Sequence, residues 1–199
     1  MNLILVRHGE TEFNRQRLIL GRGPEPLNAT GQAQALAAAV AVSRNAPFFL
    51  YSSPIVRTIQ TTEAIASECS VAFAPMPGLE EIDAGDLEGL TGSQLQEQYP
   101  DVMRGWRNDP ASAKMPNGEC LGDVQNRTWA VINDIAQRHE DDTVVVVTHN
   151  FPIQAILCKA LGMPLNNFRQ LRVDLGSITQ MDVRDSVFTM LSMNETWHL

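Results

Sequence analysis

Short apolar runs alternate with stretches of helical spacing along most of the chain. Residues 3–6 form a continuous apolar run, and residues 144–147 are consecutive valines. Short apolar runs bounded by polar residues are typical of strands that helices cover on both faces. Residues 48–51 and 71–74 are weaker strand candidates. The pattern therefore predicts a mostly parallel sheet.

Helical periodicity fills the intervals between these strands. In residues 121–138, apolar side chains recur three and four positions apart, which places them on one face of a helix. Thr30 is a candidate cap for one helix, and Pro54 suits the first turn of another. The expected helices cover 32–43, 54–68, 121–138 and 151–161, and the expected C-terminal hairpin has strands over 177–183 and 187–192.

The alternation of strand and helix is interrupted once, between about residues 76 and 118. We expect this stretch to form a short insertion over the edge of the sheet that would carry a ligand site. The chain contains no internal repeat and no low-complexity linker. We therefore predict one domain over residues 1–199. Its expected class is α/β, a three-layer α/β/α sandwich with a mostly parallel central sheet.

The balance of charges narrows the class of partner. Lys and Arg number 15 against 23 Asp and Glu, a net charge of -8. Duplex nucleic acid and anionic membranes both favour a basic face, so we expect neither as a partner. A small anionic ligand stays compatible with the sequence, because a few converging cations keep a pocket positive inside an acidic protein.

The apolar stretches and the cysteines point to a cytoplasmic protein. No stretch approaches the length of a membrane span, and the N-terminal apolar run is too short for a signal peptide. Cys69, Cys120 and Cys158 lie far apart and form no Cys-x-x-Cys pair. They are interpreted as reduced thiols rather than as a disulfide or zinc framework.

Polar side chains follow three of the predicted strands at the point where each strand ends. Arg7 and His8 follow residues 3–6, and His149 follows the valine run. Arg57 lies on the first turn of the helix after residues 48–51. In open α/β sheets, ligands bind beyond the carboxyl ends of the strands. Two histidines and two arginines are therefore expected to converge on one edge.

This set of side chains suits phosphoryl chemistry. Guanidinium groups are planar, always charged and well matched to phosphoryl oxygens. A neutral histidine is a competent nucleophile toward phosphorus, and a second histidine can donate to the charge that develops on the phosphoryl oxygens. The helix that starts near Asn150 would also favour an anion at its N-terminus.

The sequence LVRHGET at residues 5–11 resembles the signature of the histidine phosphatase superfamily, in its phosphoglycerate-mutase-like branch. Further stretches resemble that family in the same order along the chain. They are Asn14, the loop over 21–31, the second arginine motif over 52–61, the acidic loop over 79–89, the Gly118-Glu119 pair and the second histidine motif over 147–149. The resemblance covers nearly the whole chain and implies a bacterial-type phosphatase rather than a glycolytic mutase.

The resemblance also implies roles for particular residues. His8 corresponds to the nucleophile, and Glu81 corresponds to the proton donor because Gly85 follows it at the family's spacing. The implied catalytic residues are His8, Glu81, His149, Arg7 and Arg57, and the implied substrate-binding residues are Arg7, Asn14, Gly21, Arg57, His149 and Asn150. A buried carboxyl also fits the donor role on physical grounds, since burial raises its pKa.

Some of these residues have structural alternatives. Asn14 could cap the first helix, and Glu81 lies among acidic neighbours that would ordinarily form a solvated face. Leu20 stands where the family often has glutamine, and Asn150 stands where glycine is common. Both differences concern specificity rather than phosphoryl transfer. No metal and no cofactor are expected, because two arginines at the same edge repel a divalent cation.

The sequence favours a phosphomonoesterase that acts on a small phosphorylated metabolite through a phosphohistidine on His8. The alternative is a cofactor-dependent phosphoglycerate mutase, which needs a basic insertion to hold the substrate carboxylate. The corresponding region, 91–118, holds only Arg104, Arg107 and Lys114 as basic residues. A non-catalytic phosphate-binding module is the third hypothesis. The oligomeric state stays open, with a homodimer among the options.

Overall fold

Six strands form one sheet in the computed structural model, which describes residues 1–46 and 48–199. In chain order the strands are β1 (Asn2–Arg7), β2 (Phe49–Ser52), β3 (Phe73–Pro75), β4 (Thr143–Thr148), β5 (Ile178–Arg184) and β6 (Val187–Glu195). Their order across the sheet is β3-β2-β4-β1-β5-β6. The first four in that order are parallel, and β5 is antiparallel to both of its neighbours. The predicted mostly parallel sheet is confirmed.

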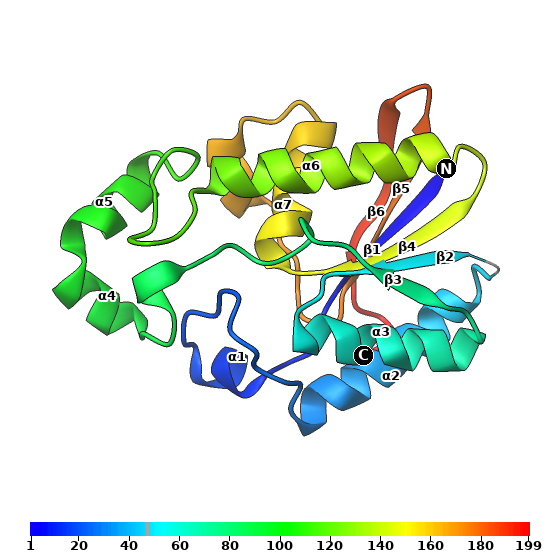
Figure 1. The fold of residues 1–199 in the computed structure, drawn as a ribbon, viewed down its shortest axis with the longest axis horizontal. Coiled ribbons are helices and arrows are strands. Elements are labelled where there is room, and N and C mark those ends of the chain that lie inside the picture. The colour runs from blue at the N-terminus through cyan, green and yellow to red at the C-terminus, as the bar shows by residue number, and fades with distance from the viewer. Residues whose placement is uncertain (47) are drawn as a thin grey trace.

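Helices cover both faces of this sheet (Figure 1). The α-helices are α1 (Glu12–Gln16), α2 (Ala29–Ser43), α3 (Val56–Cys69), α4 (Gly92–Gln98), α5 (Pro100–Asn108), α6 (Leu121–Arg138) and α7 (Asn150–Ala160), and the 3-10 helices are η1 (Gly85–Leu87) and η2 (Leu165–Gln170). The alternation of side chains along β1 shows how the layers form. Leu3 and Leu5 pack with α6 and α7, whereas Ile4 and Val6 pack with α2 and α3.

The four valines of β4 follow the same rule, since successive side chains of a strand point to opposite faces. Val144 and Val146 belong to the core on the α6–α7 side, and Val145 and Val147 belong to the core on the α2–α3 side. All four are fully buried. Burial on both faces explains why this strand is a continuous apolar run, and it confirms the three-layer α/β/α sandwich.

The structure corrects three details of the predicted helices. Pro54 lies before α3 rather than in its first turn, because that helix begins at Val56 with Ile55 as its N-cap. Asn28, rather than Thr30, caps α2, and its side chain accepts the backbone N–H of Gly31. The segment 76–118, expected to be irregular, contains two helices, α4 and α5. The signals were present, because Thr91 begins α4 with a capping box and α5 begins at a proline.

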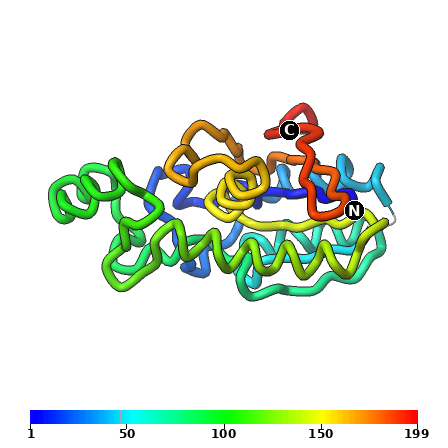
Figure 2. Tube along the Cα trace, turned by 90° about the horizontal axis from the view of Figure 1, so that it is seen from above, coloured from blue at the N-terminus to red at the C-terminus, as the bar shows by residue number. Residues whose placement is uncertain are grey.

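The segment that carries α4 and α5 projects past one end of the sheet. Figure 1 and the view turned by 90° in Figure 2 both show this projection, drawn in green. It lies at the end where the parallel strands β1, β2 and β4 terminate, because residues of this segment share a pocket with Arg7 and His8. The expected insertion over that edge of the sheet is confirmed.

Strand register brings the chemical residues together. Arg7 at the end of β1 lies opposite Thr148 at the end of β4, and Ser52 of β2 lies opposite Val147. The residues that follow, His8, Ser53 and His149, therefore leave the sheet side by side. In the described part of the chain, no helix is long and apolar enough to cross a bilayer.

Close backbone packing supports the turn after His8. A Cβ on Gly9 would lie 2.3 Å from the carbonyl oxygen of Gly31, and a Cβ on Gly31 would lie 2.0 Å from that of Glu10. Both distances are well below any real carbon–oxygen contact. Glycine at both positions therefore lets the start of α2 pack directly under the loop that carries His8.

Candidate active site

Two hydrogen bonds define the state of the His8 ring. Its Nδ1 lies 2.7 Å from the carbonyl oxygen of Gly9, which can only accept a hydrogen bond. Nδ1 therefore carries the proton, and Nε2 holds the lone pair that accepts from the Nε–H of Arg57 at 3.3 Å. Burial, followed by the charges of Arg57 and Arg7, lowers the pKa of His8 well below its usual 6.5. The ring is neutral at neutral pH.

His149 is buried beside His8. The centroids of the two rings lie 5.1 Å apart with an edge-on arrangement. The Nε2 of His149 is 2.8 Å from the hydroxyl of Ser53, whereas its buried Nδ1 has no hydrogen-bond partner among the described residues. Burial and the nearby charge of Arg57 lower the pKa of His149 well below 6.5. An anion at this position would supply the missing partner.

Arg7 is held from one side only. Its Nη1 donates to the carbonyl oxygen of Val173 at 2.6 Å, while its buried Nε has no partner within the described part of the chain. Burial lowers the pKa of Arg7, and the charges of Glu81 and Asp174 oppose that effect. Arg7 and His149 thus each present an unsatisfied polar nitrogen beside His8, which fits a phosphoryl group better than a neutral ligand.

Arg57 is fully buried on the first turns of α3 and uses every branch of its guanidinium. Besides its bond to His8, Nη1 donates to the carbonyl oxygen of Gly23 at 3.1 Å and Nη2 donates to that of Gly21 at 2.7 Å. Burial lowers the pKa of Arg57 to about 10, so the side chain keeps its charge at neutral pH. The planar fork is fixed in place before any substrate binds.

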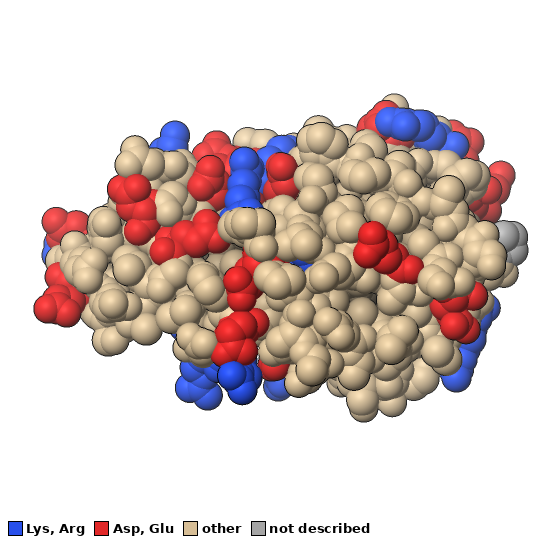
Figure 3. All heavy atoms as spheres, turned by 60° about the horizontal axis from the view of Figure 1, so that its bottom comes forward, with Lys and Arg blue, Asp and Glu red and all other residues tan. Residues whose placement is uncertain are grey.

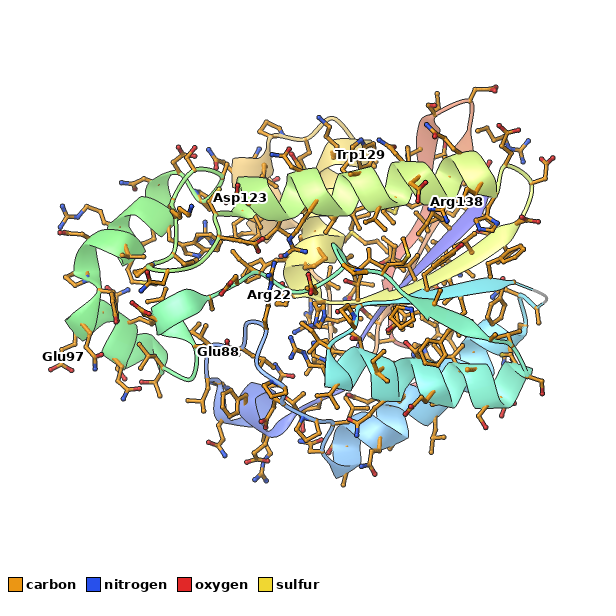
Figure 4. The ribbon with its side chains drawn as sticks, in the orientation of Figure 1. Arg22, Glu88, Glu97, Asp123, Trp129 and Arg138 are labelled. Atoms are coloured by element: carbon orange, nitrogen blue, oxygen red, sulfur yellow. The ribbon has the colours of Figure 1, made fainter. Side chains whose placement is uncertain are left out.

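Glu88 holds the loop that fixes Arg57. Its Oε1 accepts the backbone N–H groups of Gly21 and Gly23, at 3.2 and 2.7 Å. Figure 4 labels Glu88 close to Arg22, which belongs to this loop. The carbonyl groups of the loop point toward Arg57 and its amide groups point toward Glu88, so one short loop links the two charged side chains.

Glu81 is buried at the same site, opposite the first turn of α7. Its Oε1 accepts the N–H of Ile82 at 2.9 Å, and its Oε2 lies 3.5 Å from the N–H of Phe151. Burial raises the pKa of Glu81 and outweighs these bonds and the charges of Arg57 and Arg7. A carboxyl in this setting is suited to hold a proton and release it.

A half-buried ion-pair network fixes the backbone of the acidic loop. Arg127 of α6 donates to the carbonyl oxygens of Glu80 and Glu81, at 2.7 and 2.8 Å, and pairs with Glu119. Glu119 also pairs with Arg22 and accepts the N–H of Asp83. The loop that carries Glu81 is therefore tied to α6 and to the loop after α1.

A pocket of about 180 Å³ opens over these groups. Its polar lining residues are Arg7, His8, Asn14, Arg57, Glu81 and Asn150. Its apolar lining residues are Leu18, Ile19, Leu20, Ile82, Ala84, Leu87, Leu95, Met103, Trp106, Met115 and Phe151. Most of the apolar side chains come from the segment 76–118 and from the loop after α1.

Three of the predicted substrate-binding residues also have structural contacts or lie outside the pocket wall. Asn14 lines the pocket and also belongs to the capping box of α1, where its Oδ1 accepts from Thr11. Asn150 lines the pocket, and its Nδ2 donates to Gln154. Gly21 lies behind Arg57, and among the described residues the wall contains its neighbour Leu20 instead.

The sequence did not indicate several residues that shape the site. Ser53 and Glu88 lay within the resembling motifs over 52–61 and 79–89 but were assigned no role. Ser53 bonds His149, and Glu88 fixes the loop before Arg57. The contact between Arg7 and the carbonyl oxygen of Val173 spans 166 positions and has no sequence signal. The apolar wall had a partial signal in Trp106 and Met103, which recur at helical spacing in α5.

The described residues contain no group of three or more His, Cys, Asp or Glu side chains placed to hold a metal ion. The polar nitrogens that line the pocket belong to arginine, histidine and asparagine side chains. Such a donor set suits the oxygens of a phosphate monoester and not a cation.

Comparison with known proteins places the chain in a family. Residues 3–196 match the model of the histidine phosphatase superfamily, branch 1. Phosphoserine phosphatase 1 of Hydrogenobacter thermophilus is 33% identical over 199 residues, which is 100% of this chain and 94% of that protein. Probable phosphoglycerate mutase GpmB of Proteus mirabilis is 32% identical over 94% of this chain and 86% of its own length.

A solved structure agrees in fold over the same length. YhfR of Bacillus stearothermophilus superposes with a TM-score of 0.93 at 26% identity, covering 99% of this chain and 98% of that one. The two structures therefore match over nearly the whole length of both chains. With the family model spanning nearly every residue, the chain belongs to branch 1 of the histidine phosphatase superfamily and is a phosphoric monoester hydrolase.

Proposed function

We propose that His8 is the nucleophile of a two-step phosphate monoester hydrolysis. In the first step Nε2 of His8 attacks phosphorus, the bond between phosphorus and the ester oxygen breaks, and the leaving alcohol takes a proton from Glu81. In the second step water gives a proton to the Glu81 carboxylate and its oxygen attacks the phosphohistidine. Inorganic phosphate leaves, and both side chains return to their starting states.

The observation that carries this proposal is the ring state of His8. Gly9 holds the Nδ1 proton and Arg57 faces the Nε2 lone pair, so the nucleophilic atom is already deprotonated. A histidine that first had to lose a proton at neutral pH would react more slowly. The lowered pKa of His8 supports the same assignment.

The surrounding cations and donors support the role of stabilising the transferring group. Phosphoryl transfer is accelerated mainly by positioning and by fixed charges on the equatorial oxygens. Arg7 and Arg57 supply two guanidinium groups and Asn14 a neutral side-chain donor, and all three line the pocket. His149 does not line the pocket, but its buried and unpartnered Nδ1 lies beside His8 and would supply a further neutral donor. Each lies on a different element, so the group would be held from several sides.

The decisive experiment combines turnover with trapping of the intermediate. The protein is mixed with an aryl phosphate in the presence of EDTA, and the denatured protein is analysed for a phosphohistidine at residue 8. We expect turnover and a trapped phosphoryl group, both lost in His8→Ala and both kept in His198→Ala, which alters a histidine of the tail. Full activity of His8→Ala would overturn the proposal, and loss of turnover to EDTA would favour a metal-dependent reaction.

The mutase hypothesis shares the first step and differs in the second, where an alcohol rather than water takes the phosphoryl group. It is less supported, because the relatives include phosphatases and the region 91–118 contributes no basic side chain to the pocket. The product formed from 3-phosphoglycerate, with and without the bisphosphate primer, separates the two. Free phosphate supports hydrolysis, and an isomer without free phosphate would establish a mutase.

The remaining expectations concern the setting of the reaction. We propose that residues 1–199 act as one domain on a small phosphate monoester in the cytoplasm, without nucleic acid, membrane or cofactor. The three cysteines are free thiols, as suits a reducing compartment. All residues named at the site come from one chain, so a homodimer stays a prediction for measurement by sedimentation.

A further inference from the structure

The pocket is divided into two chemically different parts. The part around His8 is polar and contains Arg7 and Arg57. The other part is apolar and is closed by side chains from α4 and α5 and from the loops beside them. Because phosphorus must lie next to Nε2 of His8, the alcohol part of a bound ester would occupy the apolar part.

The apolar part offers no positive charge to a substrate. Among the described residues that line the pocket, the only lysine or arginine side chains are Arg7 and Arg57, and both lie at the phosphoryl end. Two nearby arginines are engaged elsewhere. Arg22 pairs with Glu119, and Arg169 donates to the backbone carbonyl of Trp106.

Acidic side chains surround the same region. Figure 3 shows that Asp and Glu dominate the part of this face formed by the projecting segment. A carboxylate in the alcohol part would therefore lose its hydration without gaining a cation, and it would be repelled by the surface charge. Burial of an unpaired charge is costly, whereas burial of an apolar group is favourable.

The apolar wall has a defined shape. Trp106 of α5 packs edge-on against Phe151 of α7 with ring centroids 5.7 Å apart, and it also contacts Phe168. These aromatic contacts hold the indole in place, and the thioethers of Met103 and Met115 complete the same side. A cavity of roughly 150 Å³ with an apolar lining is large enough for benzene. The whole pocket, with its phosphoryl end included, measures about 180 Å³, so one aromatic ring is the upper limit for its apolar part.

We propose, resting on the hydrolase function proposed above, that the preferred substrates are phosphate monoesters of apolar alcohols, alkyl or aryl. The part of the alcohol inside the pocket is about the size of one aromatic ring, and larger groups extend toward the opening. Phosphorylated hydroxy acids are poor substrates, even though one relative is named phosphoserine phosphatase 1. Leu20, which cannot donate a hydrogen bond to a carboxylate, contributes to this selectivity.

A comparison of four esters tests the proposal. The value of kcat/KM is measured for 2-phenylethyl phosphate, glycerol 3-phosphate, phosphoserine and 3-phosphoglycerate, all of which release aliphatic alcohols. We expect 2-phenylethyl phosphate to exceed each of the other three by roughly tenfold or more. Equal or higher values for phosphoserine or 3-phosphoglycerate would overturn it. Hydrolysis of every ester must depend on His8, so persistent activity in His8→Ala reports failure of the proposed function instead.

Two tryptophans provide a matched pair of variants. Trp106 lies in the pocket wall, whereas Trp129 is similarly half-buried on α6 and packs against Phe188 (Figure 4). We expect Trp106→Ala to lower kcat/KM for 2-phenylethyl phosphate roughly tenfold more than for methyl phosphate. Trp129→Ala should leave the ratio of the two unchanged. Equal losses on both esters in Trp106→Ala would show that the indole is merely structural and would count against the proposal.

A variant that adds a positive charge to the pocket wall provides a complementary test. Leu20 is half-exposed in the pocket wall, so a lysine there is compatible with folding. Leu20→Lys should raise the ratio of kcat/KM for 3-phosphoglycerate over that for 2-phenylethyl phosphate, because it adds the missing cation. A ratio that stays constant would indicate that the alcohol part of the substrate lies outside the apolar wall, which overturns the proposal.

Discussion

The Nε–H of Arg57 donates to Nε2 of His8 over 3.3 Å, and both side chains are buried. This contact joins the predicted nucleophile to a cation that holds the protein's own carbonyl groups with its other two nitrogens. Burial, together with this fixed positive charge, lowers the pKa of His8 and keeps the imidazole neutral. In the proposed mechanism Arg57 therefore both keeps the nucleophile unprotonated and binds the phosphoryl group of the substrate.

Replacement of Arg57 should weaken anion binding even when the charge is kept. Arg57→Ala is expected to cost about 2–5 kcal/mol in the affinity for vanadate, because it removes one partner of a desolvated charge pair. Arg57→Lys should recover little of it, since one ammonium cannot reach His8 and the two loop carbonyls together. Calorimetric titration with vanadate measures both. The exposed Arg104→Ala is the control, and unchanged affinity in Arg57→Ala would contradict the assignment.

Replacement of Glu81 should affect esters according to their leaving group. Alkoxides need a proton to leave, whereas nitrophenolate does not. Glu81→Gln is therefore expected to lower kcat for alkyl phosphates by about 10²–10⁴-fold and to affect p-nitrophenyl phosphate far less. Steady-state kinetics on both esters provide the test, with Glu80→Gln as the neighbouring control. Equal losses on the two esters would assign the proton to another group.

The expected pH profile of activity follows from a lowered pKa of His8 and a raised pKa of Glu81. His8 must be neutral to attack, and its pKa is lowered by burial, so attack persists below pH 6.5. Glu81 must be protonated to donate, and its pKa is raised by burial, so donation is lost only as pH rises through that higher value. We expect kcat/KM for an alkyl phosphate to be bell-shaped, with an acidic limb below pH 6.5 from His8 and an alkaline limb from Glu81 at a pH above the ordinary carboxyl pKa. The alkaline limb should disappear with p-nitrophenyl phosphate, and a limb of the same size there would contradict the role of Glu81.

The sequence predicts the sheet better than the insertion because the two are held by different interactions. The valine run of β4 is apolar at every position because the strand is buried on both faces, and such a run is visible in the sequence itself. The helix α6 begins and ends at the predicted residues, 121 and 138, for a similar local reason. The helices α4 and α5 are short and partly exposed, and they are stabilised by packing against the pocket, so their short periodic signals and caps were too brief to predict two helices there.

The residues of the candidate site also fall into two groups, those that a local sequence pattern predicts and those that depend on tertiary contacts. His8 and His149 were found because each directly follows a buried strand, and parallel strands bring such positions to one edge. Ser53 and Glu88 act through contacts that depend on the tertiary arrangement of loops. Gly21 is an example of the second kind. Its backbone carbonyl oxygen orients Arg57, and a backbone contact of this kind leaves no pattern in the sequence.

Glu88 is expected to position Arg57 without touching substrate. Glu88→Ala removes the acceptor of the Gly21 and Gly23 N–H groups, so the loop should lose its hold on the guanidinium. We expect vanadate affinity to fall on the order of tenfold, the scale of one hydrogen bond to a charged group. Glu88→Gln should recover part of it, because an amide oxygen still accepts. Glu97→Ala, at the far end of α4 in Figure 4, is the control, and an unchanged affinity in Glu88→Ala would exclude the positioning role.

The two buried histidines should make the fold less stable as the pH falls. Burial holds the pKa of both His8 and His149 well below 6.5, the ordinary value that each regains on unfolding. Below pH 6.5 the two histidines bind protons in the unfolded chain but stay neutral in the folded chain. The free energy of unfolding therefore decreases as the pH falls below 6.5. Each histidine contributes up to about 1.4 kcal/mol per pH unit to the slope. Urea unfolding between pH 7.5 and 5 measures it, and His8→Asn/His149→Asn should show a shallower slope. Equal slopes in the two proteins would mean that other groups control acid unfolding.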